Sequence, residues 1–131
     1  LIDESYNSNP LSLRSAIKNF NMIKVNNSKK HLILGDMLEL GSHSKKLHLE
    51  VTKNINSTSI DRVNVIGRYI KETYKNIHKS KKGIILNEIS EIFDLIKSDI
   101  NNNDYLMIKG SNATELHKVS SHLKKGKTNA L

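Results

Sequence analysis

The side chains that could do chemistry in this sequence gather in three short polar segments. Residues 4–9 read ESYNSN, residues 35–41 read GDMLELG, and residues 109–112 read KGSN. They supply carboxylates, amides, hydroxyls and a lysine, the groups that bind a polar ligand through hydrogen bonds and charge. Gly110 permits close backbone approach, and Ser111 or the backbone amides that open the next helix can hold an anion. These segments are therefore the predicted ligand-binding part of the chain.

Metal and thiol chemistry have little support. The chain has no cysteine, which excludes disulfides and thiolate metal ligands. His43 and His48 are five residues apart, a poor spacing for two ligands on one helical face, so we predict no metal site. We expect His48 to be structural, and His31 to lie at the surface or at a helix end without a role. The GKT at residues 126–128 lacks the upstream glycine of a phosphate loop.

Five apolar runs alternate with segments of helical spacing. The runs cover residues 1–3, 31–34, 62–67, 83–86 and 105–110. The helical segments cover residues 10–23, the stretch after Ser42 or Ser44, and residues 69–78, 89–100 and 114–123. Strict alternation predicts an α/β fold, a three-layer Rossmann-like sandwich with a mostly parallel sheet of five to six strands and helices on both faces. Residues 1–131 are expected to form one domain.

Local signals predict how the first two helices begin and which side they bury. Pro10 suits the first turn of a helix whose buried side would end at Met22 or Ile23. Ser42 or Ser44 could cap the second helix.

Ligands of parallel sheets bind beyond the carboxyl ends of the strands. The three polar segments follow the first, second and fifth runs, so we expect them to line one shared surface.

The net charge of +8 raises the question of an anionic partner. The basic residues are mostly lysines scattered in short doublets, without interleaved aromatic residues, which favours a solvated surface over nucleic-acid binding. A stand-alone basic α/β module that binds anionic ligands remains an alternative function. No apolar run approaches the roughly 20 residues of a membrane span, and no signal peptide is visible.

Three motifs in order resemble the C-terminal domain of the Mur ligase family. They are DESYNSNPLSLRSAI at residues 3–17, LGDMLELGSHSKKLH at residues 34–48 and IKGSN at residues 108–112. The chain is most similar to the type that adds D-alanyl-D-alanine. Other Mur ligases and folylpolyglutamate synthetases carry a shorter first motif, so Tyr6 and Asn7 favour this type and leave those sister enzymes as the alternative.

The resemblance implies nucleotide contacts in the first segment. Glu4 matches the acid expected to bind the ribose of ATP, because a carboxylate accepts hydrogen bonds from both hydroxyls of a diol. Asp3 could share this role. Tyr6, Asn7 and Asn9 would edge the nucleotide, although Asn9 before a proline also fits simple helix-start chemistry.

The resemblance also implies contacts to the dipeptide D-Ala-D-Ala. Asp36 and Glu39 could orient its amine or brace neighbouring loops. Its carboxylate would be held after the last strand, where Asn112 stands in place of the Arg of many relatives, and where Ser111 could also cap a helix. The residues concerned are Lys109, Gly110, Ser111 and Asn112.

The implied whole enzyme is a cytoplasmic, monomeric ligase of peptidoglycan synthesis with three domains. The first would hold UDP-N-acetylmuramoyl-tripeptide, and the second would carry the ATP phosphate loop, the Mg²⁺ ligands and a carbamylated lysine. ATP would phosphorylate the tripeptide carboxylate, and the D-Ala-D-Ala amine would attack the acyl phosphate. Because the chain starts abruptly on Leu1, we expect a fragment without those two domains, without catalytic residues and inactive alone.

Overall fold

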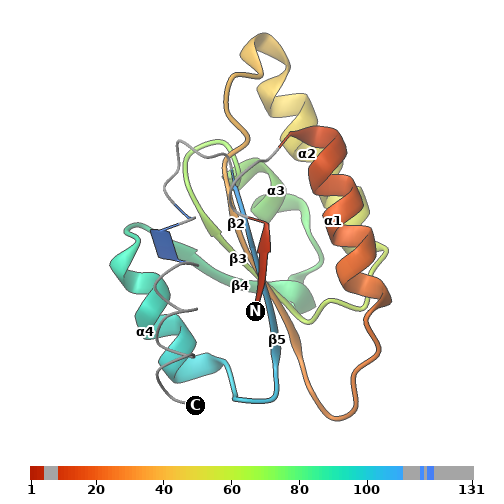
Figure 1. Ribbon diagram of the computed structural model, residues 1–131. Coiled ribbons are helices and arrows are strands. Elements are labelled where there is room, and N and C mark those ends of the chain that lie inside the picture. Colours follow the sequence, from red (N-terminus) through yellow and green to blue (C-terminus); the bar gives the residue numbers. More distant parts are fainter. Residues whose placement is uncertain (5–8, 111–115, 117, 120–131) are drawn as a thin grey trace.

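A parallel sheet of five strands lies at the centre of the molecule (Figure 1). The computed structural model describes residues 1–4, 9–110, 116, 118 and 119. The strands are β1 (Ile2–Glu4), β2 (Lys30–Gly35), β3 (Arg62–Ile66), β4 (Lys82–Leu86) and β5 (Tyr105–Lys109), in the order β1-β5-β2-β3-β4. All neighbouring strands in this sheet run parallel, so their carboxyl ends meet at one edge.

Helices cover both faces of the sheet. They are α1 (Pro10–Met22), α2 (Ser44–Asn56), α3 (Lys71–Asn76) and α4 (Ser90–Asp99), with short 3-10 turns at Gly41–His43 and Lys79–Lys81. Figure 1 shows α1, α2 and α3 on one side of the sheet and α4 on the other. The predicted three-layer α/β class is confirmed. Within the described residues, no helix has the length and apolarity that crossing a membrane requires.

Each face of the sheet has its own apolar core. Leu32 and Leu34 of β2 point to the side where Phe20 of α1 and Ile55 of α2 pack. Ile33, between them in sequence, points to the opposite side. There it joins a cluster formed with α4, β4, β5 and two residues near the carboxyl end: Leu86, Ile92, Leu95, Leu106, Ile108, Leu116 and Val119. Burial on both faces explains why the strands are continuous apolar runs.

Helix α1 begins with a capping box, as its first residues allow. Asn9 Oδ1 accepts a hydrogen bond from the Ser12 amide at 2.9 Å, and Ser12 Oγ accepts one from the Asn9 amide at 3.0 Å. Pro10 occupies the first turn, as predicted. At the other end Ile23 packs against the core whereas Met22 is 69% exposed, so Ile23 is the residue that faces inward.

The predicted serine cap of α2 is wrong. His43 stands at the N-cap position with helical backbone angles and makes no side-chain capping bond. The 3-10 turn Gly41–His43 runs directly into the helix, so no extended residue precedes the first turn. Ser44 is the first residue of α2 instead, and Ser42 lies inside the 3-10 turn.

Candidate functional site

The sheet topology brings the ends of β1, β5 and β2 together. Glu4 is the register partner of Lys109, and Lys109 is in turn the partner of Leu34. Gly35, which starts the second polar segment, follows directly. The three predicted segments therefore begin side by side at the carboxyl edge of the sheet, which is the usual ligand edge of parallel α/β folds.

Several predicted site residues lie outside the described part of the chain. These are Tyr6, Asn7, Ser111 and Asn112. Asp3 and Glu4 are placed by their backbone at the end of β1. Asn9 is described, and its side-chain oxygen is engaged in the capping box of α1. That geometry supports the helix-start interpretation of Asn9.

Lys109 and Gly110 are buried where β5 ends. The Lys109 residue is only 1% exposed, although it carries a charged group. It follows Met107 by two positions, so it points to the face of the sheet that packs against α1 and α2. A buried cation beside the end of β1 places positive charge at the edge where the polar segments meet.

Asp36 connects the loop after β2 to the turn after β3. Its Oδ2 accepts a hydrogen bond from the Arg68 amide at 3.0 Å, and its Oδ1 accepts one from the Ile70 amide at 2.7 Å. The residue is 7% exposed. A Cβ on Gly67, whose φ is +134°, would lie 2.6 Å from this carboxyl group. Asp36 was predicted either to orient the dipeptide amine or to brace neighbouring loops, and these hydrogen bonds support the bracing role.

His48 holds the same loop from the other side. The Met37 amide donates to His48 Nε2 at 3.1 Å, so that nitrogen has no proton. Nδ1 therefore carries the proton and donates to the Ser44 carbonyl at 2.8 Å. The ring is fully buried, and Thr73 of α3 donates its hydroxyl to the His48 carbonyl. These contacts agree with a structural role for His48.

Glu39 differs from Asp36 in both exposure and backbone conformation. It is exposed at the tip of the loop and has a φ of +62°. Among the described residues other than glycine, Asn27 alone shares a positive φ. A strained left-handed residue persists when its surroundings hold it in place, and such residues cluster at ligand sites. The braces on Asp36 and Met37 hold the loop that presents Glu39.

Two features, one at each end of the sheet, were not anticipated. The turn at residues 67–70 was given no role, yet its amides bind Asp36; the glycine at position 67 was the available signal. The second is His31, whose predicted surface or helix-end position is wrong. It lies in β2 and is 3% exposed, and its Nε2 lies 3.0 Å from Oδ2 of Asp104, the residue before β5. Within the described residues, no cluster of three metal-ligating side chains occurs.

A family model and curated relatives agree on one enzyme family. The model described as "Mur ligase, glutamate ligase domain" matches residues 1–112. UDP-N-acetylmuramoyl-tripeptide–D-alanyl-D-alanine ligase of Buchnera aphidicola is 34% identical over 126 residues, which cover 94% of this chain and 26% of that protein. The Bacillus subtilis ligase of the same name is 28% identical, with 94% and 27% covered. The chain spans about a quarter of the length of these relatives.

Solved structures show the same fold. MurF ligase from Thermotoga maritima in complex with ADP superposes with a TM-score of 0.75 at 21% identity, covering 97% of this chain and 28% of that one. MurF from Acinetobacter baumannii gives 0.73 at 21% identity, covering 92% and 26%. With the matched model, the shared motifs and the shared fold together, the chain belongs to the Mur ligase family, in its glutamate ligase domain.

Proposed function

We propose that this chain is the part of a D-alanyl-D-alanine-adding Mur ligase that contacts ATP and the incoming dipeptide. The observation that carries the proposal is the strand register, which places Glu4 of β1 beside Lys109 of β5 at the carboxyl edge, next to the loop that follows β2. The curated relatives named as UDP-N-acetylmuramoyl-tripeptide–D-alanyl-D-alanine ligases support the choice of this type over its sister ligases.

The nucleotide side of the site is assigned to the end of β1. Glu4, helped by Asp3, accepts hydrogen bonds from the ribose hydroxyls of ATP. Tyr6 and Asn7 line the nucleotide beside it. Asn9 supports them indirectly, since its capping box sets where α1 begins.

The dipeptide side of the site is assigned to the end of β5 and the loop after β2. Lys109 contributes positive charge near the carboxylate of D-Ala-D-Ala, and Gly110, Ser111 and Asn112 complete that contact. Glu39, exposed on its braced loop, is placed to attract the dipeptide amine. Orientation of both substrates at one edge lowers the entropic cost of bringing the amine to the activated carboxyl group.

The reaction itself needs groups from the rest of the enzyme. The tripeptide carboxylate attacks the γ-phosphorus of ATP, so ADP leaves and an acyl phosphate forms. The dipeptide amine then attacks the acyl carbon, an amide bond forms, and phosphate leaves with the electron pair of the broken bond. Mg²⁺ and the phosphate loop belong to the central domain, and we place the whole enzyme in the cytoplasm as a monomer.

Glu4→Gln and Lys109→Met in the complete ligase test the assignment. Glu4→Gln replaces an acceptor with a donor, and a hydrogen bond to a charged group contributes about 1.5–3 kcal/mol, so the KM for ATP should rise about ten- to a hundredfold. Lys109→Met keeps the buried length but loses the charge, so it should raise mainly the KM for D-Ala-D-Ala. Steady-state kinetics with each substrate varied in turn measures both.

Thermal unfolding of both variants separates substrate effects from loss of structure. Lys45→Met, on the exposed side of α2, serves as the control for the removal of a lysine charge. The assignment is wrong if the Glu4 and Lys109 variants weaken the same substrate equally, or if neither constant differs from that of the control.

The isolated chain should release no phosphate from ATP above background. Catalysis of phosphoryl transfer depends on positioning the γ-phosphate by a phosphate loop and metal, which the proposal assigns to the other domains. Phosphate release is assayed with ATP, UDP-N-acetylmuramoyl-tripeptide and D-Ala-D-Ala present. Activity that follows the purified chain through successive columns would contradict the proposed division of labour.

A further inference from the structure

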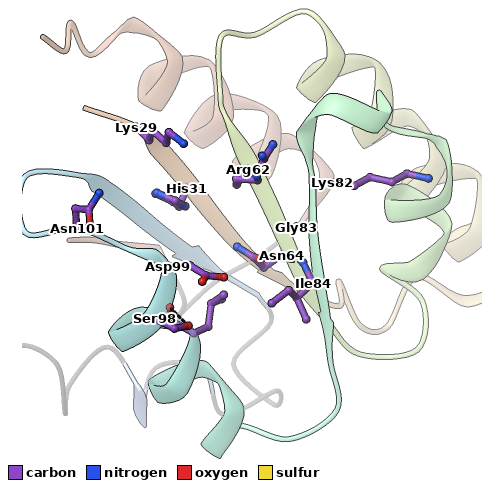
Figure 2. A pocket seen from close by; sticks show the side chains of 11 residues that line it. Lys29, His31, Arg62, Asn64, Lys82, Gly83, Ile84, Ser98, Asp99 and Asn101 are labelled. Atoms are coloured by element: carbon purple, nitrogen blue, oxygen red, sulfur yellow. Dashed lines mark hydrogen bonds between the residues drawn. The ribbon is translucent and has the colours of Figure 1, made fainter. Parts of the chain in front are cut away.

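A second polar site lies at the opposite end of the sheet from the candidate ligand edge. A pocket of about 530 Å³ opens between the amino-terminal parts of β2, β3 and β4 and the end of α4 (Figure 2). Its lining includes Lys29, His31, Arg62, Ile84 and Leu95. This volume lies within the range of about 300–1,000 Å³ that small-molecule sites occupy.

The pocket exists because the α4 face of the sheet is polar at this end. His31 and Arg62 are register partners on β2 and β3, and Asn64 pairs with Ile33 one step further on. Toward the carboxyl ends the same face is apolar and packs against α4. Three polar side chains therefore interrupt strands that are otherwise continuous apolar runs.

His31 is oriented by a buried carboxylate. Asp104 accepts hydrogen bonds from the Lys29 amide, the Asn101 amide and His31 Nε2, each at 3.0 Å. Burial opposes ionisation of Asp104, but these hydrogen bonds outweigh it and hold the pKa of its carboxyl group below the usual range. Asp104 is a carboxylate and can only accept, so Nε2 is the His31 nitrogen that carries the donated proton in this pair.

This leaves His31 Nδ1 as an acceptor in the wall of the pocket. In the part of the chain that the structure describes, no residue hydrogen-bonds to Nδ1. The asparagine nearby cannot serve it, because Asn64 Nδ2 donates to the Leu32 carbonyl and its Oδ1 accepts from the Ile84 amide. A ligand that fits His31 must therefore present a hydrogen-bond donor.

Positive charge surrounds this acceptor. Arg62 Nη1 donates to the carbonyls of Asp61 and Ser80, which fixes the guanidinium and leaves its other donors available. The side chain of Lys29 is exposed at the mouth of the pocket. Lys82 turns away, since its Nζ donates to the Lys75 carbonyl (Figure 2). Of the acids nearby, Asp104 is engaged by three hydrogen bonds and Asp99 is among the lining residues, so Arg62 and Lys29 are the cations that an anion would meet.

We propose that this pocket binds a phosphate group that carries a proton. The phosphate oxygens accept hydrogen bonds from Arg62 and Lys29, while the P–OH donates to His31 Nδ1. Sulfate matches phosphate in shape and charge class but has no proton to donate at neutral pH. Ile84 and Leu95 offer apolar contact to an organic body larger than phosphate itself. The site is separate from the proposed ATP edge, and its failure would leave that proposal untouched.

Titration of the chain with inorganic phosphate, followed by backbone and imidazole NMR signals at constant ionic strength, tests the proposal. The signals of His31 and Arg62 should shift saturably, with those of residues 35–41 unchanged. Sulfate should bind about tenfold more weakly, as expected for one missing hydrogen bond.

Three variants locate the contacts. Arg62→Ala and Lys29→Ala should each weaken phosphate binding about tenfold, through loss of a charge-assisted hydrogen bond, whereas Lys45→Ala should not. His31→Lys retains a donor for Asp104 and has no acceptor, so it should abolish the preference for phosphate over sulfate. Unsaturable shifts, equal binding of both anions to the unmodified chain, or no effect of the Arg62 and Lys29 changes would overturn the proposal.

Discussion

Asp36→Ala is expected to lower the free energy of unfolding by about 3–5 kcal/mol, measured by urea denaturation. Each hydrogen bond to a charged group contributes about 1.5–3 kcal/mol, and this change removes two, one from the buried Ile70 amide and one from the amide of the exposed Arg68. Both amides belong to the turn that enters α3, and the buried Ile70 amide is left without an acceptor. Asp36→Asn retains one oxygen acceptor and should cost roughly half as much.

Asp94→Ala is the matched control, because Asp94 is an exposed acid on α4 and its removal should change stability little. If Asp36 and Asp94 variants unfold at the same urea concentration, the brace does not hold the fold. If Asp36→Asn is instead as stable as the unmodified chain while the complete ligase loses affinity for D-Ala-D-Ala, Asp36 is a substrate contact rather than a brace.

His48→Leu is expected to cost about 2–4 kcal/mol of unfolding free energy. The change leaves the buried Met37 amide without an acceptor, at about 1–3 kcal/mol, and removes one of the two donors to the Ser44 carbonyl, which keeps the helical bond from the backbone amide of residue 48. Leucine has a similar volume, so packing is largely kept and the polar loss is what is measured. The same change at exposed His43 provides the control.

Ring nitrogen NMR shifts provide an independent check on His48. They should report a neutral imidazole protonated on Nδ1, because the Met37 amide can only donate to Nε2. A ring protonated on Nε2 would contradict the described contact. So would an equal loss of stability in the His43 and His48 variants.

The fold could be predicted because its signals are local. Each strand is a short apolar run, each long helix repeats apolar residues at helical spacing, and Pro10 marks the start of α1. Alternation alone then requires parallel strands with their carboxyl ends at one edge. The same alternation predicted that Glu4 and Lys109 would lie at this edge, and the strand register places them there.

The roles of individual polar residues depended on distant partners. Asp36 could bind a substrate or brace a loop, and the choice required knowing that the amides of Arg68 and Ile70 fold against it. His31 looked exposed because its partner, Asp104, lies far along the chain on the approach to β5. The prediction of how α2 begins was wrong for a different reason, because a 3-10 turn stands where a serine cap was expected.

The position of β1 has a consequence for the order of folding. Strand β1 has three residues and, among the described strands, pairs only with β5, so it must wait for a strand about 100 residues further along before it has a partner in this sheet. Closing so long a loop is entropically costly, and contacts of this kind form late. Detachment of β1 breaks no other strand pair, so this strand can open while the rest of the sheet stays folded. We therefore expect the pairing of Glu4 with Lys109 to form late in folding and to open before the other strand pairs.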